Sequence, residues 1–169
     1  MRFRGVVYRA HNPEWAWKPL SGEGARRHGG RFNRRGVPAL YTSLSPLTAI
    51  REAQPLGRRM QPLTLCAYDV DLEPVFDSRD GAVRAALQVD DHELDCRSWA
   101  AQMLDGSVPA SQALADRLVS DGYVGMLVRS FAVAAGPGDI NLVVWKWGSQ
   151  RPCRVDLIDD ESRLSTSSR

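Results

Sequence analysis

The sequence has little of what marks a membrane, secreted or metal-binding protein. No apolar run is long enough to span a bilayer, and the first residues, Met1 to Arg9, lack the apolar stretch of a signal peptide. The three cysteines, Cys66, Cys96 and Cys153, are odd in number and widely spaced, which fits neither a disulfide framework nor a zinc site. These absences predict a protein of the reducing cytoplasm that is not exported.

The best-known catalytic and cofactor-binding signatures are absent too. No Gly-x-Gly-x-x-Gly follows a strand and there is no Walker loop, so a dinucleotide would not be bound in the Rossmann manner. Gly-x-Ser-x-Gly is missing, and no cysteine has an obvious histidine partner, so nucleophilic hydrolase chemistry has no support. We predict no metal site, because no helical metal pair is formed by the scattered residues His11, His28 and His92.

Charge is nearly balanced, with 22 basic and 20 acidic side chains and a formal net charge of +2. The chain therefore lacks the overall cationic field that drives non-specific nucleic-acid binding, and any anion site must be local. One candidate is a run without acids that holds Arg26, Arg27, Arg31, Arg34 and Arg35. The hydrophobic share of 43% and the charged share of 25% are ordinary for a globular chain, which we predict to form one domain.

Strand-like and helix-like patterns predict one domain with both kinds of element over residues 1–160, followed by a polar tail at 161–169. Strands are expected at 1–10, as an edge strand, and at 37–42, 63–70, 123–131, 141–147 and 155–158. One helix is expected to begin at Ser45-Pro46. Two more are expected at 91–104 and 111–120, with core residues Leu94, Ala100, Met103, Leu104, Leu114, Leu118 and Val119. Residues 11–30 are predicted to be a long loop, and 33–36 the turn of a hairpin.

The stretch from His28 to Glu52 carries the most chemical information. Arg31 follows two glycines, and its planar guanidinium is suited to grip a diphosphate; a solvated arginine is the plainer interpretation. Tyr41 closes an apolar strand, where its ring packs in a core or stacks on a flat heterocycle. Glu52 lies on the next helix, where it pairs with a neighbouring arginine or stabilises positive charge at an anomeric carbon.

Two polar residues near strand ends extend this set. Ser130 ends an apolar strand, and Asn141 opens the next one after a Gly-Pro-Gly loop. Both are common capping residues, so a structural role explains them adequately. Ligand-binding groups nevertheless gather at such positions, which makes both residues candidates for a site.

Several ordered blocks of the sequence resemble the RES domain. The blocks are Trp17 to Asn33, Ala39 to Ser43, Ala49 to Glu52, Asp121 to Ser130 and Asn141 to Trp145, within a match that runs from Tyr8 to about Trp147. The arginine, glutamate and serine for which the family is named map onto Arg31, Glu52 and Ser130. Phe32 stands where tryptophan is frequent and Trp145 where phenylalanine is frequent, and neither departure removes a polar group.

The resemblance implies a toxin of a bacterial toxin–antitoxin pair, a homodimer neutralised by an Xre-type helix-turn-helix antitoxin. It also implies an α+β fold, with a mixed or antiparallel sheet flanked by helices, similar to ADP-ribosyltransferase toxins, and cleavage of NAD at the nicotinamide–ribose bond. The ADP-ribose would pass to a protein, to phosphate or to water. Arg31, Tyr41 and Glu52 would act in catalysis and bind NAD, and Ser130 and Asn141 would hold its nicotinamide end.

Two other functions remain open from the sequence. A nucleic-acid-binding protein or ribonuclease toxin would use the basic hairpin from Arg26 to Arg35, with Trp15 and Trp17 as stacking platforms. A non-catalytic interaction protein would present the same aromatic and basic residues to a partner. The NAD hypothesis makes a geometric demand that separates it from both, because Arg31, Glu52 and Ser130 must face one cleft.

Overall fold

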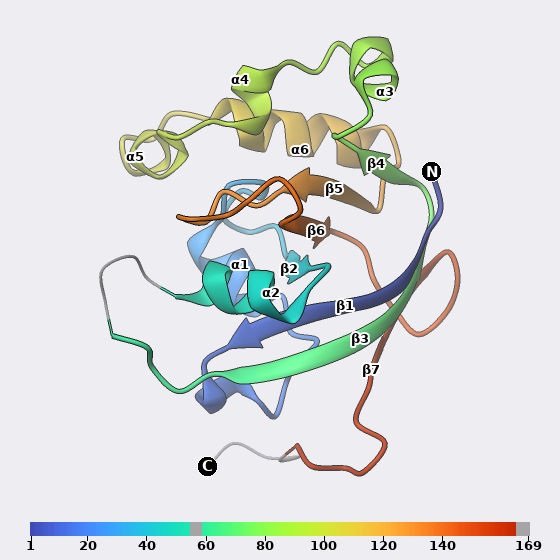
Figure 1. Cartoon of the computed structure of the whole chain (residues 1–169). Coiled ribbons are helices and arrows are strands. Elements are labelled where there is room, and N and C mark those ends of the chain that lie inside the picture. The colour runs from blue at the N-terminus through green and yellow to red at the C-terminus, as the bar shows by residue number, and fades with distance from the viewer. Residues whose placement is uncertain (55–58, 165–169) are drawn as a thin grey trace.

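The computed structural model describes residues 1–54 and 59–164, which form an α+β domain around a mixed, seven-stranded sheet (Figure 1). The strand order is β4-β5-β6-β2-β1-β3-β7, and every pair except β4–β5 is antiparallel. The bounds are β1 Phe3–His11, β2 Leu40–Ser43, β3 Thr64–Leu72, β4 Val75–Asp77, β5 Gly125–Arg129, β6 Ile140–Val144 and β7 Cys153–Leu157. The predicted fold class is confirmed.

Short helices cover the sheet. They are the 3-10 turn η1 Pro13–Trp15 and the helices α1 Glu23–His28, α2 Pro46–Ala53, α3 Gly81–Ala86, α4 Asp91–Leu94, α5 Trp99–Leu104 and α6 Ala110–Ser120. Helices α3 to α6 gather at one end of the molecule, beyond β4 to β6, whereas α2 lies beside β1 and β2 (Figure 1). Among the described residues, no helix has the length and apolar character needed to cross a membrane.

The strands β5 and β6 are buried on both faces. Leu142 belongs to a core cluster on one face, with Tyr68 of β3, whereas the next residue, Val143, belongs to a second cluster with Leu114 and Leu118 of α6. Each fully buried side chain of this size contributes roughly 1.5–3 kcal/mol. Burial on two faces explains why these strands appear in the sequence as nearly continuous apolar runs.

The first strand is an interior strand, so the prediction of an edge strand is wrong. β1 pairs with β3 along its whole length, from Phe3 opposite Leu72 to His11 opposite Thr64, and β2 pairs on its other side at Tyr8. A strand's own sequence does not reveal how many neighbours it acquires, because its partners come from distant parts of the chain.

The predicted loop over residues 11–30 contains helix α1. The glycines were interpreted as bends. Gly22 instead allows the backbone to pack closely against Trp147, since a Cβ atom there would lie 2.6 Å from the Trp147 ring. The helix gains support from Glu23, which pairs with Arg26 and Arg27 one turn later. The turn at 34–36 exists, with Gly36 at φ 92°, but it does not join two strands as the hairpin prediction required.

The helix predicted over 91–104 is split into α4 and α5. The interruption includes Cys96, which is buried. Its carbonyl accepts a hydrogen bond from Arg31 in place of a bond within a helix. Leu94 is buried as predicted, whereas Ala100 and Leu104 are exposed.

The remaining predictions have mixed outcomes. Ser45 caps α2 and Pro46 opens it as expected, and Leu114 and Leu118 of α6 are buried, but Val119 is 42% exposed. The elements α3 and β4 were not predicted. Part of the predicted polar tail, residues 165–169, lies outside the described residues.

Candidate functional site

A cavity of about 510 Å³ lies where β1, β2, α2 and the loop after α1 meet. Four of the five predicted site residues line it: Arg31, Tyr41, Glu52 and Asn141. Residues that were not predicted complete the wall, among them Tyr8, Arg9, His11, Trp99 and Phe131. The volume is in the range of sites for small molecules and cofactors.

Arg31 stands at the tip of a tight turn between Gly30 and Asn33, whose backbone groups bond at 3.0 Å. The turn requires glycine at position 30, because a Cβ atom there would lie 2.5 Å from the Tyr41 hydroxyl oxygen. The Arg31 guanidinium lies 4.2 Å from the centre of the Phe131 ring, and its Nη1 donates to the Cys96 carbonyl at 2.8 Å. These contacts leave the guanidinium on the cavity wall.

The charge of Arg31 is not neutralised by an ion pair within the described part of the chain. Burial lowers its pKa, and nearby acidic groups, Asp95 first among them, oppose that shift. An arginine remains charged at neutral pH even so. A half-buried cation without a carboxylate partner is a strong attractor for an anionic group of a ligand.

The Tyr41 hydroxyl is fully engaged in holding the Arg31 turn. It accepts a hydrogen bond from the Phe32 backbone N–H at 3.0 Å and donates to Asn33 Oδ1 at 2.7 Å. Burial raises the pKa of Tyr41, so the hydroxyl stays neutral. What Tyr41 offers to the cavity is therefore its ring.

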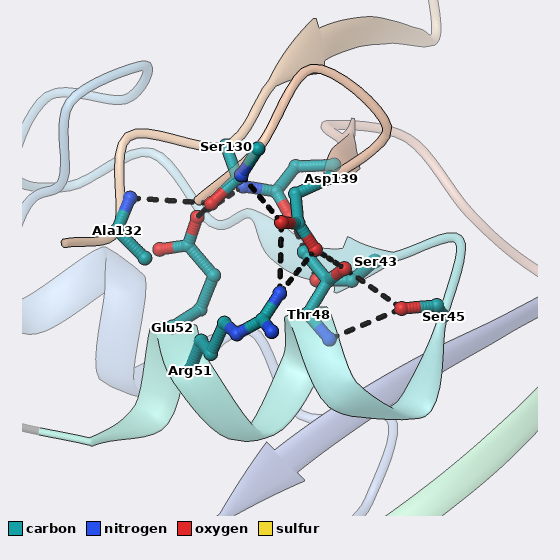
Figure 2. A network of polar contacts seen from close by, with 10 residues as sticks. Ser43, Ser45, Thr48, Arg51, Glu52, Ser130, Ala132 and Asp139 are labelled. Carbon is teal, nitrogen blue, oxygen red and sulfur yellow. Dashed lines mark hydrogen bonds and ion pairs between the residues drawn. The ribbon is translucent and has the colours of Figure 1, made fainter. Parts of the chain in front are cut away.

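Glu52 lies in the last turn of α2, and one of its carboxylate oxygens receives two hydrogen bonds (Figure 2). Ser130 Oγ donates to Oε1 at 2.6 Å, and Asn141 Nδ2 donates to the same atom at 2.5 Å. The Asn141 amide is itself oriented by Ser43, whose hydroxyl donates to Oδ1 at 2.7 Å. No described residue bonds to the other oxygen, Oε2, so a fixed carboxylate retains a free acceptor.

Ser130 departs from the predicted geometry. It contacts Glu52, as the hypothesis of a shared cleft requires, but it lines a neighbouring cavity rather than the one that holds Arg31. Its hydroxyl oxygen also accepts from the Ala132 backbone N–H at 3.2 Å. Its position is that of a residue that orients the Glu52 carboxylate.

A second half-buried cation, Arg9, was not predicted as a site residue. Its Nη1 donates to the carbonyls of Pro19 and Ser21 at 3.1 and 3.0 Å, and burial lowers its pKa. His11, next on the same wall, has its pKa lowered first by burial and then by the Arg9 charge. An arginine within an interior strand is unusual and would have indicated a site at this end of the cavity. The signal was missed because β1 was expected to be an edge strand, where an arginine is ordinary.

Three of the other four arginines of the basic cluster form ion pairs on the surface, whereas Arg35 forms none within the described residues. Arg26 and Arg27 pair with Glu23 at 2.8 and 2.9 Å, and Arg34 pairs with Asp116. Glu23 and Asp116 thus reduce, without removing, the positive charge that this cluster could offer to a nucleic-acid backbone. Among the described residues, no group of three or more His, Cys, Asp or Glu side chains is placed to hold a metal ion.

Comparison with known proteins assigns the chain to a family. The search of curated proteins finds no match, whereas a solved structure, the M. tuberculosis MbcT–MbcA toxin–antitoxin complex, has a chain of similar fold. The TM-score is 0.60 at 21% identity, over 94% of this chain and 84% of that chain. The sequence model of the RES domain matches residues 6–165, nearly the whole chain, and the chain therefore belongs to the RES domain family.

Proposed function

We propose that the protein is an NAD-consuming toxin that cleaves the nicotinamide–ribose bond and passes ADP-ribose to a protein, to phosphate or to water. The observation that carries this proposal is the sharing of one cavity by an unpaired cation, Arg31, and an oriented carboxylate, Glu52. NAD presents the matching groups, because it carries a diphosphate and, next to the scissile bond, a ribose that becomes positively charged.

The cavity residues fit the parts of NAD in order. Arg31 and Arg9 supply positive charge for the diphosphate. Tyr41 offers its ring to the nicotinamide or its ribose, since its hydroxyl is already bonded. Glu52 and Asn141 stand together at the reacting end, with Ser130 behind the carboxylate.

This arrangement supports catalysis by charge stabilisation. The nicotinamide ring of NAD is a positively charged pyridinium that takes the bonding electron pair and departs as neutral nicotinamide, so departure requires no strong acid. As the bond breaks, positive charge develops on the ribose, and a carboxylate fixed beforehand stabilises it without reorganising. The two hydrogen bonds to Oε1 fix the Glu52 carboxylate and leave Oε2 for the ribose. Binding both ends of NAD supplies the remaining effect through orientation.

A toxin–antitoxin setting is supported by the family and by a structural neighbour that is part of a toxin–antitoxin complex. We include in the proposal an Xre-type antitoxin as partner and a homodimeric toxin. Its place of action is the cytoplasm, which contains NAD and where the three free cysteines stay reduced. Co-expression of the chain with a candidate antitoxin, followed by co-purification, tests the partnership.

The enzymatic proposal is tested by incubating the protein with NAD and measuring nicotinamide release. Glu52→Ala should abolish release, and Arg31→Ala should raise KM, because the diphosphate loses its cation. Arg27→Ala is the matched control, since this arginine lies in the same cluster but pairs with Glu23 on the surface. Absence of release from the wild type, or full release from Glu52→Ala, would refute the proposal. Repeating the assay with and without phosphate and candidate proteins identifies the acceptor.

A further inference from the structure

We propose that Asp139 is a positioning residue that fastens helix α2 to the turn before β6 and thereby fixes Glu52 against Ser130 and Asn141. The catalytic consequence rests on the proposed function of Glu52, whereas the structural part stands independently. Asp139 directly follows the Gly-Pro-Gly loop at residues 136–138.

The Asp139 carboxylate bonds to α2 through two side chains (Figure 2). Thr48 Oγ1 donates to its Oδ1 at 2.5 Å. Arg51 Nη1 reaches both carboxylate oxygens, at 2.9 and 2.8 Å. Thr48 and Arg51 stand one turn apart on the helix, immediately before Glu52, so Asp139 contacts the helix at the turn that presents the catalytic carboxylate.

The same residue is tied to the segment that holds the partners of Glu52. Its carbonyl accepts from the Ser130 backbone N–H at 2.8 Å, and its Oδ2 accepts from the Gly136 N–H at 2.7 Å. Asn141 follows two residues later in β6. Asp139 therefore lies between Ser130 and Asn141 on one side and α2 on the other, and it bonds to both sides.

Helix α2 needs such a connection because its apolar contacts are few. It is eight residues long, and only Thr48 and Ala49 are buried. A helix of this length has little stability of its own, so tertiary contacts must set its position. One of its two buried residues is Thr48, which donates to Asp139. This polar contact therefore helps to hold the helix in place.

The carboxylate is charged under ordinary conditions. The Thr48 hydroxyl, then the Gly136 N–H and the Arg51 charge, hold the pKa of Asp139 below its usual value of 3.8. The Asp139 side chain is 12% exposed and that of Arg51 is 43% exposed. The contact is thus half-sheltered, which favours a fixed geometry over a fluctuating surface pair.

The experiment compares Asp139→Ala with Asp71→Ala in the full chain. Asp71 is a matched control, because its ion pair with Arg2 measures 2.5 Å, with the Asp71 side chain 7% and the Arg2 side chain 40% exposed. Asp71 lies on β3 near the start of β1, whereas the cavity lies at the other end of β1. We expect Asp139→Ala to lower kcat for nicotinamide release roughly 10- to 100-fold, the cost of misplacing a catalytic group by about 1 Å. The KM for NAD should change less than about threefold, while Asp71→Ala leaves kcat unchanged.

A second pair of variants separates the hydrogen bond from general packing. Thr48→Val keeps the shape of the side chain but removes the donor to Asp139, so we expect a kcat loss approaching that of Asp139→Ala. Thr48→Ser keeps the hydroxyl and should retain most of the activity. Equal losses in Thr48→Val and Thr48→Ser would overturn the positioning role, because they would assign the effect to lost packing.

Crystal structures of the wild type and Asp139→Ala give a readout that does not depend on activity. We expect the distance from Ser130 Oγ to Glu52 Oε1, 2.6 Å in the wild type, to lengthen beyond hydrogen-bonding range in the variant. An unchanged distance overturns the proposal even if the wild type releases no nicotinamide. Absence of wild-type release, together with a displaced Glu52, would refute the proposed function and leave the positioning role standing.

Discussion

The two walls of the cavity are held by different kinds of contact. The Arg31 wall, residues 29–33, is fixed by neutral hydrogen bonds to its backbone: Gln112 donates to the Gly30 carbonyl at 2.9 Å, and Trp145 Nε1 donates to the Phe32 carbonyl at 2.8 Å. The Glu52 wall consists of α2 and Asn141, with Ser130 and Asp139 behind it as supports. Each of its contacts includes a charged carboxylate, that of Glu52 or that of Asp139, and the Arg51 side chain that pairs with Asp139 is open to solvent.

Because of this difference, substitutions in the two walls should affect stability and activity to different degrees. Breaking a buried neutral hydrogen bond leaves a polar group unsatisfied and costs about 1–3 kcal/mol, with little dependence on salt or pH. An exposed ion pair adds little to folding and is weakened by salt, but it still directs the groups that it joins. We therefore expect changes in the Arg31 wall to lower stability first, and changes in the Glu52 wall to lower turnover first.

The largest expected effect comes from Glu52→Gln, which tests the Glu52 wall without disturbing its shape. The amide oxygen can accept the same bonds from Ser130 and Asn141, so the side chain keeps its place but loses its charge. Nicotinamide release should fall roughly 100- to 1000-fold, as for removal of a group that stabilises transition-state charge. The midpoint of urea unfolding should remain near that of the wild type, and a large drop in that midpoint would contradict the comparison.

Gly30→Ala should have the next largest effect, on the Arg31 wall. The added Cβ would lie 2.5 Å from the Tyr41 hydroxyl oxygen and 2.7 Å from Asn33 Oδ1, so the turn must open. We expect a loss of about 1–3 kcal/mol in the free energy of unfolding, measured by urea denaturation, together with a raised KM for NAD. Gly148→Ala is the control, because a Cβ there has no neighbour within 4 Å. Equal stability of the two variants would count against a tightly packed turn.

The smallest effect is a difference in acid sensitivity. The folded-state pKa of Asp139 is depressed, so its contribution to stability is complete above the ordinary aspartate value of 3.8 and is lost as pH falls through the folded value. The free energy of unfolding of Asp139→Asn should therefore fall less steeply between these two pH values than that of the wild type. Acid titrations followed by circular dichroism measure this difference. Gln112→Ala, which alters the Arg31 wall, should lower stability by a similar amount at every pH in that window. A Gln112→Ala loss that varied with pH would contradict the distinction.

The parts of this site that depend on neighbouring residues could be predicted from the sequence. The parts that depend on contacts between distant residues could not. The start of α2 follows from Ser45 and Pro46, whose effects act within one helical turn. Arg31 and Glu52 stand out because their chemistry lies within one short stretch of sequence. Arg9 and Asp139 were missed, because their roles arise from strand pairing and from contacts across 91 residues of sequence, as between Thr48 and Asp139.

The four-residue strand β2 has a consequence for how the site keeps its dimensions. Tyr41 bonds to the Arg31 turn, and Ser43, two residues later on the same face, bonds to Asn141 beside Glu52. Two steps along a strand span roughly 6.6 Å. β2 thus acts as a spacer that sets the separation of cation and carboxylate. Inserting one residue between Tyr41 and Ser43 would turn one of them to the opposite face and uncouple the two walls, even with every ligand-contacting residue intact.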